Sequence, residues 1–350
     1  MVDRNLDRLS LATLYLTERC NSRCVSCDYW RHGRVDMNLD RVMRLLPSLE
    51  RLGTQVVLLS GGEPLLNPEW SAIAGLLREA GLKLWLLTSG LSLAKHARRA
   101  TELFDAITVS LDGTDRQTYA AIRGLDAFNK VCDGIRAAAM QGVSPSLRVT
   151  VQRANFRQLP SFVSVAKELG ARQVSFLAVD VANPHAFGRT DDFKSDLALL
   201  PADLPVFEQV LRTLEFEFAE ELQTGFIAEN PRKLRRIWEY FAAIQGMGSY
   251  PPVRCNAPEF SAVIGATGRV QPCFFIAGPS DAVLAGDAAS GSAAESPGAD
   301  LDRVLNGGGM RALRTAIRTG KRAECKTCVC SMWRDPEVIR NFTLPMRFAP

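Results

Sequence analysis

The thiol groups of this 350-residue chain are gathered in two parts of the sequence. Three of the nine cysteines lie close together near the N-terminus: Cys20, Cys24 and Cys27. Five more follow residue 250: Cys255, Cys273, Cys325, Cys328 and Cys330. Only Cys132 is isolated, and we expect it to be a small buried hydrophobe in a helix. Because the chain starts without the apolar segment of a secretory signal, clustered cysteines indicate metal ligation rather than disulfide bonds.

The N-terminal cysteines have the spacing C-x₃-C-x₂-C and directly follow an apolar run at residues 12–16. Thiolates bind iron and zinc, and four ligands complete either a tetrahedral zinc site or a cubane [4Fe–4S] cluster. Three cysteines would leave one iron of a cubane open to a ligand from outside the protein. A structural zinc ion would need a distant fourth ligand, for which His32 is a candidate. The spacing alone leaves both sites open.

Short apolar runs alternate with amphipathic stretches through the first half of the chain. The runs with strand character are residues 12–16, 55–59, 83–87, 106–110, 146–151 and 173–177. The helix-like stretches between them are residues 39–52, 68–79, 93–103, 128–140 and 159–169. This alternation predicts βαβ units in a parallel α/β sheet. Six units are too few for a closed eight-fold barrel, so we expect an open, partial (β/α)₆ barrel that binds ligands at the carboxyl ends of its strands.

Three parts are expected along the chain: a barrel core at residues 1–200, a helical connector at 201–250 and a small α+β domain at 251–350. The connector reads as two helices, at residues 204–221 and 231–245, with Asp203 placed to cap the first. Residues 281–300 are rich in Ala, Gly and Ser and predict a mobile loop.

Polar motifs follow the predicted strands in a regular order. They are Ser60-Gly61-Gly62-Glu63-Pro64, Thr88-Ser89-Gly90, Val109-Ser110-Leu111-Asp112-Gly113 and Tyr119-Ala120-Ala121-Ile122-Arg123-Gly124. Gly61 and Gly62 allow the backbone to approach a ligand closely, and Glu63 offers a carboxylate to an ammonium group. Each motif taken alone is also compatible with an ordinary turn, in which Ser110 and Asp112 cap the backbone.

Together with the cysteine run, these motifs resemble the radical S-adenosylmethionine (radical SAM) superfamily over about residues 10–180. The resemblance implies a [4Fe–4S] cluster on Cys20, Cys24 and Cys27 whose open iron binds S-adenosylmethionine (SAM). One electron would then cleave SAM to methionine and a 5′-deoxyadenosyl radical, which abstracts hydrogen from a substrate. The residues that the resemblance assigns to SAM binding are Gly61, Gly62, Glu63, Ser89, Ser110 and Asp112.

One position departs from the pattern of this superfamily. The residue before the third cysteine is usually aromatic there and lies beside the adenine, whereas this chain has Ser26. Tyr29 or Trp30 is expected to cover the adenine instead, or to be a core aromatic. Arg123 is equally compatible with a surface ion pair and with a ligand contact.

The C-terminal cysteines resemble the auxiliary-cluster extensions of radical SAM enzymes that are called SPASM and twitch domains. Cys255, Gly268 and Cys273 give the spacing C-x₁₂-G-x₄-C of their shared hairpin, and Cys325 and Cys328 give C-x₂-C. Five cysteines are fewer than the seven of a full SPASM domain, so the single-cluster twitch type is the closer match. The resemblance implies one auxiliary [4Fe–4S] cluster on Cys255, Cys273, Cys325 and Cys328. The alternatives are a Cys₄ zinc ribbon, and Cys330 in place of Cys328.

An auxiliary cluster with four cysteine ligands favours net oxidation or cross-linking, because it has no open iron and passes electrons. The resemblance therefore implies a radical SAM oxidoreductase or peptide-modifying enzyme, acting on a peptide or on a small molecule such as an aminocyclitol. The implied partners are a flavodoxin- or ferredoxin-type electron donor and, for a peptide substrate, a separate leader-peptide-binding protein. The alternative is a non-catalytic iron–sulfur electron carrier or a zinc-binding scaffold. The substrate pocket is expected at the strand ends, with candidate residues Arg148, Gln152, Asp180 and His185.

Composition excludes several other classes. The formal net charge is +4, and no basic run forms the patch that nucleic-acid binding requires. No apolar run approaches the roughly 20 residues of a membrane helix. We expect a cytoplasmic protein.

Overall fold

The computed structural model describes residues 5–31, 33–183, 186–189, 195–284 and 300–335. The strands are β1 (Leu11–Thr17), β2 (Val56–Gly61), β3 (Lys83–Thr88), β4 (Ala106–Ser110), β5 (Ser146–Val151), β6 (Gln173–Ala178), β7 (Ser261–Ile264) and β8 (Val270–Gln271). The first nine helices are α1 (Leu39–Arg51), α2 (Trp70–Glu79), α3 (Leu93–Leu103), α4 (Arg116–Arg123), α5 (Phe128–Met140), α6 (Leu159–Glu168), α7 (Leu204–Glu217), α8 (Ala219–Thr224) and α9 (Pro231–Ile244). The last three are α10 (Leu301–Leu305), α11 (Gly308–Arg318) and α12 (Ala323–Lys326).

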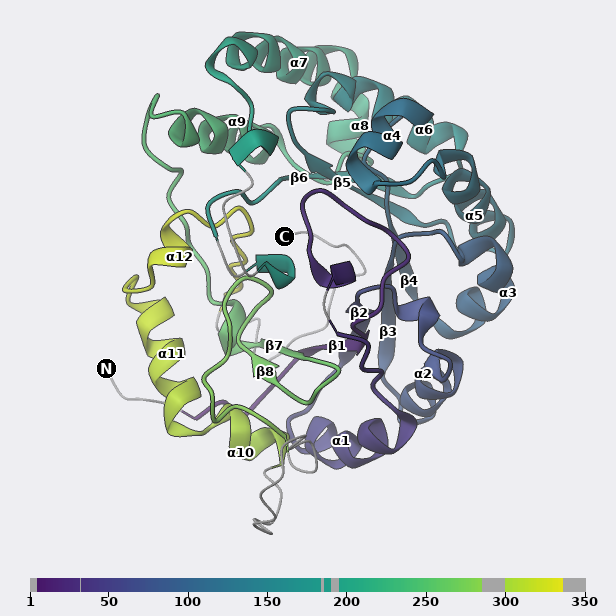
Figure 1. Ribbon diagram of the computed structural model, residues 1–350, viewed down its shortest axis with the longest axis vertical. Coiled ribbons are helices and arrows are strands. Elements are labelled where there is room, and N and C mark those ends of the chain that lie inside the picture. The colour runs from purple at the N-terminus through teal and green to yellow at the C-terminus, as the bar shows by residue number, and fades with distance from the viewer. Residues whose placement is uncertain (1–4, 32, 184–185, 190–194, 285–299, 336–350) are drawn as a thin grey trace.

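All eight strands belong to one sheet with the order β6-β5-β4-β3-β2-β1-β7-β8. Strands β1 to β6 are parallel neighbours in chain order, which confirms the predicted α/β fold with a partial six-stranded barrel. The helices form an outer ring around the sheet, and α9 to α12 lie on the side opposite α2 to α5 (Figure 1). All six strands therefore direct their carboxyl ends to one edge, where the ligand site was expected.

Apolar patterning explains why these elements form. Strand β2 is buried along Val56 to Ser60, as expected for a parallel strand covered on both faces. Helix α1 buries Val42, Leu45 and Leu49, which recur at helical spacing. Its first turn is capped by Asn38, whose side chain accepts a hydrogen bond from the amide of Arg41.

The C-terminal hairpin extends the barrel sheet. Strand β7 runs parallel to β1, pairing Leu11 with Ser261 and Leu14 with Ile264, while β8 is antiparallel to β7. Gly268, expected at the turn of this hairpin, has a φ of 80° there. The cysteine-bearing C-terminal part is thereby attached at the open edge of the barrel.

Three local expectations differ from the structure or fall outside it. The predicted helix 204–221 is divided into α7 and α8 at Phe218, whose φ and ψ are −119° and 33°. Asp203 does not cap α7 with its side chain, because its carboxylate faces Arg157 at 2.9 Å instead. Residues 285–299 of the predicted loop lie outside the described residues. The predicted domain boundaries at residues 200 and 250 stay predictions. The helices of the predicted connector pack on the barrel, because α7 contacts α6 and α9 contacts β6.

Candidate functional site

The loop that carries the N-terminal cysteines follows β1 and is fastened to the end of α4. The amide of Arg23 donates to the carbonyl of Arg123, and the amide of Val25 donates to that of Ile122, each at 3.0 Å. Gly124 ends α4 with a φ of 72°, and a Cβ there would lie 2.4 Å from the carbonyl oxygen of Arg23. Since only glycine accepts both the conformation and the contact, Gly124 is required for this docking.

The other side of the cysteine loop rests on the two glycines after β2. The amide of Gly62 donates to the carbonyl of Thr17, and the amide of Glu63 donates to that of Arg19, each at 2.8 Å. A Cβ would lie 2.6 Å from the Thr17 oxygen if built on Gly61, and 2.2 Å from the Arg19 oxygen if built on Gly62. From the sequence, we expected these glycines to let the backbone approach a ligand closely. In the structure, they let it approach residues 17–19, which lead into Cys20.

The three thiols of this loop are partly buried, and two of them contact backbone groups. The amide of Ser22 donates to Cys20 Sγ at 3.4 Å, and the thiol of Cys27 donates to the carbonyl of Phe187 at 3.6 Å. Burial raises the pKa of Cys20 to about 11 and that of Cys27 to about 12. The positive charge of a bound metal would favour the thiolate forms of Cys20 and Cys27 against this effect of burial.

Within the described part of the chain, no three Cys, His, Asp or Glu side chains come close enough to hold one metal ion. His32, the candidate fourth zinc ligand, lies outside the described residues.

A buried ion pair lies directly behind the loop. Arg123 Nε is 2.8 Å from Asp112 Oδ2, and both side chains are at most 10% exposed. Arg123 Nη1 also donates to Cys24 Sγ at 3.3 Å. The second Asp112 oxygen accepts from the amide of Thr150 at 2.7 Å. In this structure Asp112 holds the arginine that faces a cysteine, and Arg123 is buried rather than at the surface.

Glu63 is fully buried next to the cysteine loop. Its Oε1 accepts from the Thr88 hydroxyl at 2.7 Å and from the Leu65 amide at 3.2 Å, while Oε2 accepts from the Ser89 amide at 2.7 Å. The Ser89 hydroxyl in turn donates to Asn21 Oδ1 at 3.3 Å, next to the first cysteine. The carboxylate is fixed by donors of its own chain, and Oε2 retains a lone pair that can accept one more.

Two further predicted SAM-site residues lie near this edge. Ser110 is the last residue of β4 and is partly exposed there. Tyr29 lies in a short 3₁₀ helix after the cysteines, and its ring meets that of Tyr15 edge-on, with centroids 5.8 Å apart. Burial raises the pKa of Tyr29 to about 12. Trp30 instead carries the guanidinium of Arg31 over its ring, at 4.7 Å.

The predicted substrate-pocket residues that the structure describes have different surroundings. Gln152 and Asp180 are buried, and Asp180 Oδ1 accepts from the backbone amides of Ala182 and Asn183 at 3.0 and 2.9 Å, which holds a turn. Arg148 interacts electrostatically with Glu229 and Cys330. His185 lies outside the described residues.

The C-terminal cysteines converge on one cavity, which is lined by Cys255, Cys273, Cys325, Cys328 and Cys330. The amide of Phe275 donates to Cys273 Sγ at 3.5 Å, and the thiol of Cys328 donates to the carbonyl of Cys330 at 3.1 Å. Burial raises the pKa of Cys273 to about 12, and those of Cys325 and Cys330 to about 11. The four predicted ligands are therefore together, and Cys330 is with them. We refer to this space as the cysteine cavity.

Asn183 and residues 186–189 contact both groups of cysteines. Arg189 donates from Nη2 to the carbonyl of Ser26 at 3.0 Å and from Nη1 to that of Asn183 at 3.1 Å. The Asn183 side chain donates to the carbonyl of Phe275 at 2.6 Å. Phe187 has a φ of 57°, which a bulky residue rarely adopts, and its ring meets that of Phe275 edge-on at 5.4 Å. This segment thus touches both the N-terminal cysteine loop and the wall of the cysteine cavity.

Tyr15 of β1 interacts with both cysteine groups. Its hydroxyl interacts electrostatically with Cys27 of one group and Cys273 of the other, and burial raises its pKa well above the ordinary value. Its ring is 6.4 Å from that of Phe274. Sequence reasoning missed Tyr15, Arg189 and Phe187, because a tyrosine in a strand and residues in a loop carry no motif.

Comparisons with known proteins agree with this geometry. Residues 14–156 match the model of the Radical SAM superfamily. The matched residues include the N-terminal cysteines and the polar motifs after β2, β3 and β4. The match supports the [4Fe–4S] cluster and SAM that the resemblance to this superfamily implies as cofactors.

Among curated relatives, Fe-coproporphyrin III synthase of Methanosarcina barkeri is 24% identical over 268 residues, which are 71% of this chain and 66% of that protein. GTP 3′,8-cyclase of Klebsiella pneumoniae is 35% identical over 162 residues, 43% of this chain and 49% of that protein. The chain thus spans 66% and 49% of the length of these two relatives.

Two solved structures share the fold. Streptococcus suis SuiB bound to SAM aligns with a TM-score of 0.62 at 12% identity, covering 94% of this chain and 74% of that one. The protein anSMEcpe with bound SAM and a Cp18Cys peptide aligns with a TM-score of 0.57 at 20% identity, covering 77% and 75%. Among the described residues, no helix is both long and apolar enough to cross a lipid bilayer.

Proposed function

We propose that this chain is a radical SAM oxidoreductase that removes hydrogen from its substrate at the N-terminal site and passes the remaining electron to an auxiliary [4Fe–4S] cluster in the cysteine cavity. The observation that supports the proposal most directly is that the two cysteine groups are near each other. Tyr15 interacts electrostatically with Cys27 and Cys273, and Asn183 and Arg189 hydrogen-bond to the segments that carry these cysteines. A single-site metalloprotein does not require this second group of thiols.

At the N-terminal site, Cys20, Cys24 and Cys27 hold the cluster. Bound there, the [4Fe–4S] cluster and SAM supply reductive cleavage to methionine and a 5′-deoxyadenosyl radical. Glu63 accepts the ammonium group of SAM through Oε2, and Arg123 supplies a positive charge next to Cys24. Gly61 and Gly62 keep the cysteine loop against β2. Ser89, Ser110 and Asp112 line or support the same strand ends, and Tyr29 lies on the adenine side.

In the C-terminal part, Cys255, Cys273, Cys325 and Cys328 hold the auxiliary cluster, and Cys330 is the extra thiol. The five cysteines lie within one largely apolar cavity whose other lining includes Phe274, Ile276 and Met332. A cluster held by four protein ligands would have no open iron and would supply an acceptor for one electron. Loss of a hydrogen atom, one electron and one proton would be a net two-electron oxidation of the substrate, which includes dehydrogenation and cross-linking.

The substrate is a peptide or a small molecule. A peptide is supported by solved structures of the same fold that hold peptides, SuiB with its precursor peptide SuiA and anSMEcpe with Cp18Cys. A small molecule is supported by two curated relatives, a GTP 3′,8-cyclase and an Fe-coproporphyrin III synthase. A flavodoxin- or ferredoxin-type protein supplies the electron, and a peptide substrate brings a separate leader-binding protein. The cysteines must stay reduced to bind iron, and the cytoplasm keeps thiols reduced. We therefore propose a cytoplasmic location.

The experiment is anaerobic reconstitution followed by iron analysis and incubation of the reduced protein with SAM. The proposal expects about eight irons per chain, as two cubanes, and slow release of 5′-deoxyadenosine without substrate. Eight irons with no 5′-deoxyadenosine would favour an iron–sulfur electron carrier instead. Zinc in place of iron would favour a zinc-binding scaffold and would exclude both the radical SAM enzyme and the electron carrier.

A further inference from the structure

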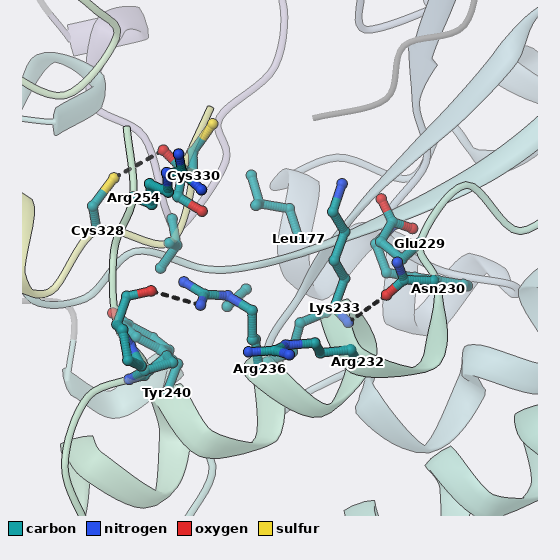
Figure 2. A pocket seen from close by; sticks show the side chains of 17 residues that line it. Leu177, Glu229, Asn230, Arg232, Lys233, Arg236, Tyr240, Arg254, Cys328 and Cys330 are labelled. Carbon is teal, nitrogen blue, oxygen red and sulfur yellow. Dashed lines mark hydrogen bonds between the residues drawn. The ribbon is translucent and has the colours of Figure 1, made fainter. Parts of the chain in front are cut away.

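A second cavity adjoins the cysteine cavity and is unusually rich in positive charge. It measures about 270 Å³ and lies between the carboxyl end of β6, the first half of α9 and residues 251–254 and 328–331. Arg232, Lys233 and Arg236 extend into this region from α9, and Arg254 lies across from them beside Cys328 and Cys330 (Figure 2). We refer to it as the cationic cavity.

The described cations of this cavity outnumber its acidic side chains, because Lys233 interacts electrostatically with Glu229 and the lining holds no second carboxylate. Arg232, Lys233 and Arg254 form no ion pair with any described acidic residue, although Arg254 stacks on the ring of Trp333 at 3.7 Å. Arg236 uses Nη1 to donate to the carbonyl of Pro252 at 2.7 Å and so fixes the wall. A concave surface that gathers several cations of one sign attracts anions strongly.

Glu229 is the only carboxylate among the described lining residues, and it is already engaged. Its Oε1 accepts from the Ser175 hydroxyl at 3.0 Å and its Oε2 accepts from the Phe176 amide at 2.7 Å. Glu229 is 3% exposed, so it is part of the wall that joins β6 to α9. One carboxylate held in this way leaves a net positive charge facing the cavity.

The position of the cavity connects it to the chemistry. Cys328 and Cys330 line both the cationic cavity and the cysteine cavity, so the two spaces share a wall. The cavity is also at the carboxyl end of β6, at the edge where parallel sheets bind ligands. Its volume is near the lower end of small-ligand sites.

We propose that the cationic cavity binds a carboxylate or phosphate group of the substrate and thereby anchors it against the auxiliary cysteines. This inference rests on the proposed function, and it assigns the substrate to the class of anionic molecules, whether peptides with acidic side chains or phosphorylated or carboxylated small molecules. Arg232 and Arg254 provide the fork of donors that matches an oxyanion, and Lys233 provides a third charge.

The test is calorimetric titration of the reconstituted holoprotein, at low ionic strength, with glutarate and separately with phenyl phosphate, which present the two oxyanions without chelating iron strongly. We expect one bound anion per chain for at least one probe. Lys233→Met and Arg254→Gln should each weaken binding at least tenfold. The matched variants Lys95→Met and Arg98→Gln, on the exposed face of α3, should bind as the unaltered protein does.

The outcomes are distinguishable. Binding of glutarate alone identifies a carboxylate, and binding of phenyl phosphate alone identifies a phosphate. Either result supports the inference. If neither probe binds, or if both cavity variants bind with unchanged affinity, the inference is wrong. Release of 5′-deoxyadenosine in the same preparation reports on the proposed function separately, because it needs SAM but no substrate.

Discussion

Arg123 Nη1 lies 3.3 Å from the sulfur of Cys24, so a buried guanidinium faces one of the three cysteines of the N-terminal site. The same guanidinium is held by Asp112 at 2.8 Å. A thiolate in a buried loop is stabilised by a nearby positive charge, and that charge is itself stabilised by the carboxylate behind it. The three residues therefore form one electrostatic unit that joins β4, α4 and the cysteine loop.

This unit predicts a large stability cost when one charge is removed alone. Arg123→Met leaves the Asp112 carboxylate buried without its cation, so we expect the free energy of unfolding to fall by about 3–5 kcal/mol in urea denaturation of the metal-free protein. The double variant Arg123→Met/Asp112→Asn should recover part of this loss. Arg116 is on the same helix as Arg123 and forms an exposed ion pair with Asp126, so Arg116→Met should cost less than about 1 kcal/mol. Equal costs for Arg123→Met and Arg116→Met would contradict the buried unit.

The glycine contact beneath the cysteine loop predicts a loss of metal binding without direct removal of a ligand. Gly62→Ala places a Cβ 2.2 Å from the carbonyl oxygen of Arg19, so the loop must move. We expect a destabilisation of about 1–3 kcal/mol and a reconstituted protein that lacks the N-terminal cluster. Gly75→Ala is the matched control, because its Cβ on α2 meets nothing within 4 Å and should stabilise the helix by about 0.5–1 kcal/mol. Full iron content in Gly62→Ala would show that the contact can relax.

The position of Glu63 predicts that substituting it weakens SAM binding without changing cluster assembly. Glu63→Gln keeps the shape of the side chain but removes the charge that the ammonium group of SAM requires, and its amide nitrogen replaces one oxygen that accepts from the chain. A charge-assisted hydrogen bond contributes about 1.5–3 kcal/mol, so the dissociation constant for SAM should rise about 10- to 100-fold. Iron content should not change. Glu69→Gln, at an exposed position where the carboxylate accepts from the Leu39 amide, is the control and should leave SAM affinity unaltered. Unchanged affinity in Glu63→Gln would remove this residue from the SAM site.

The fold was largely predictable because its signals are local. Each strand of the barrel is an apolar run with a helix-like stretch after it, and the C-x₃-C-x₂-C spacing falls directly after the first run. The pairing of β7 with β1 was not predictable, because it joins Leu11 to Ser261 across most of the chain and no sequence period records it.

The site was predictable only in part, for a similar reason. The cysteines could be found because thiolate chemistry restricts them to clusters. The burial of Arg123 depends on how α4 docks on the cysteine loop, so its sequence was equally compatible with a surface ion pair. Arg189 and Tyr15 act through contacts with distant segments and have no local signal.

The proposed ligand set of the cysteine cavity predicts that removing a ligand cysteine lowers the iron content, whereas removing the extra thiol of Cys330 does not. Cys255→Ala should lower the iron content from about eight to about four per chain, spare release of 5′-deoxyadenosine and abolish substrate oxidation. Cys330→Ala should retain about eight irons, and Cys132→Ala, buried in α5, should behave as the unaltered protein does. The measurements are iron analysis and product assay on anaerobic protein. A four-iron Cys330→Ala together with an eight-iron Cys328→Ala would exchange the roles of these two residues.

The most direct measurement is the Mössbauer spectrum of the Cys255→Ala variant, reconstituted with ⁵⁷Fe and recorded with and without SAM. Because the remaining cubane has three cysteine ligands, the account predicts that one iron site separates from the other three and shifts its parameters when SAM is added. Four equivalent irons that do not respond to SAM would contradict it, since no corner of the cluster would then be open to the nucleotide.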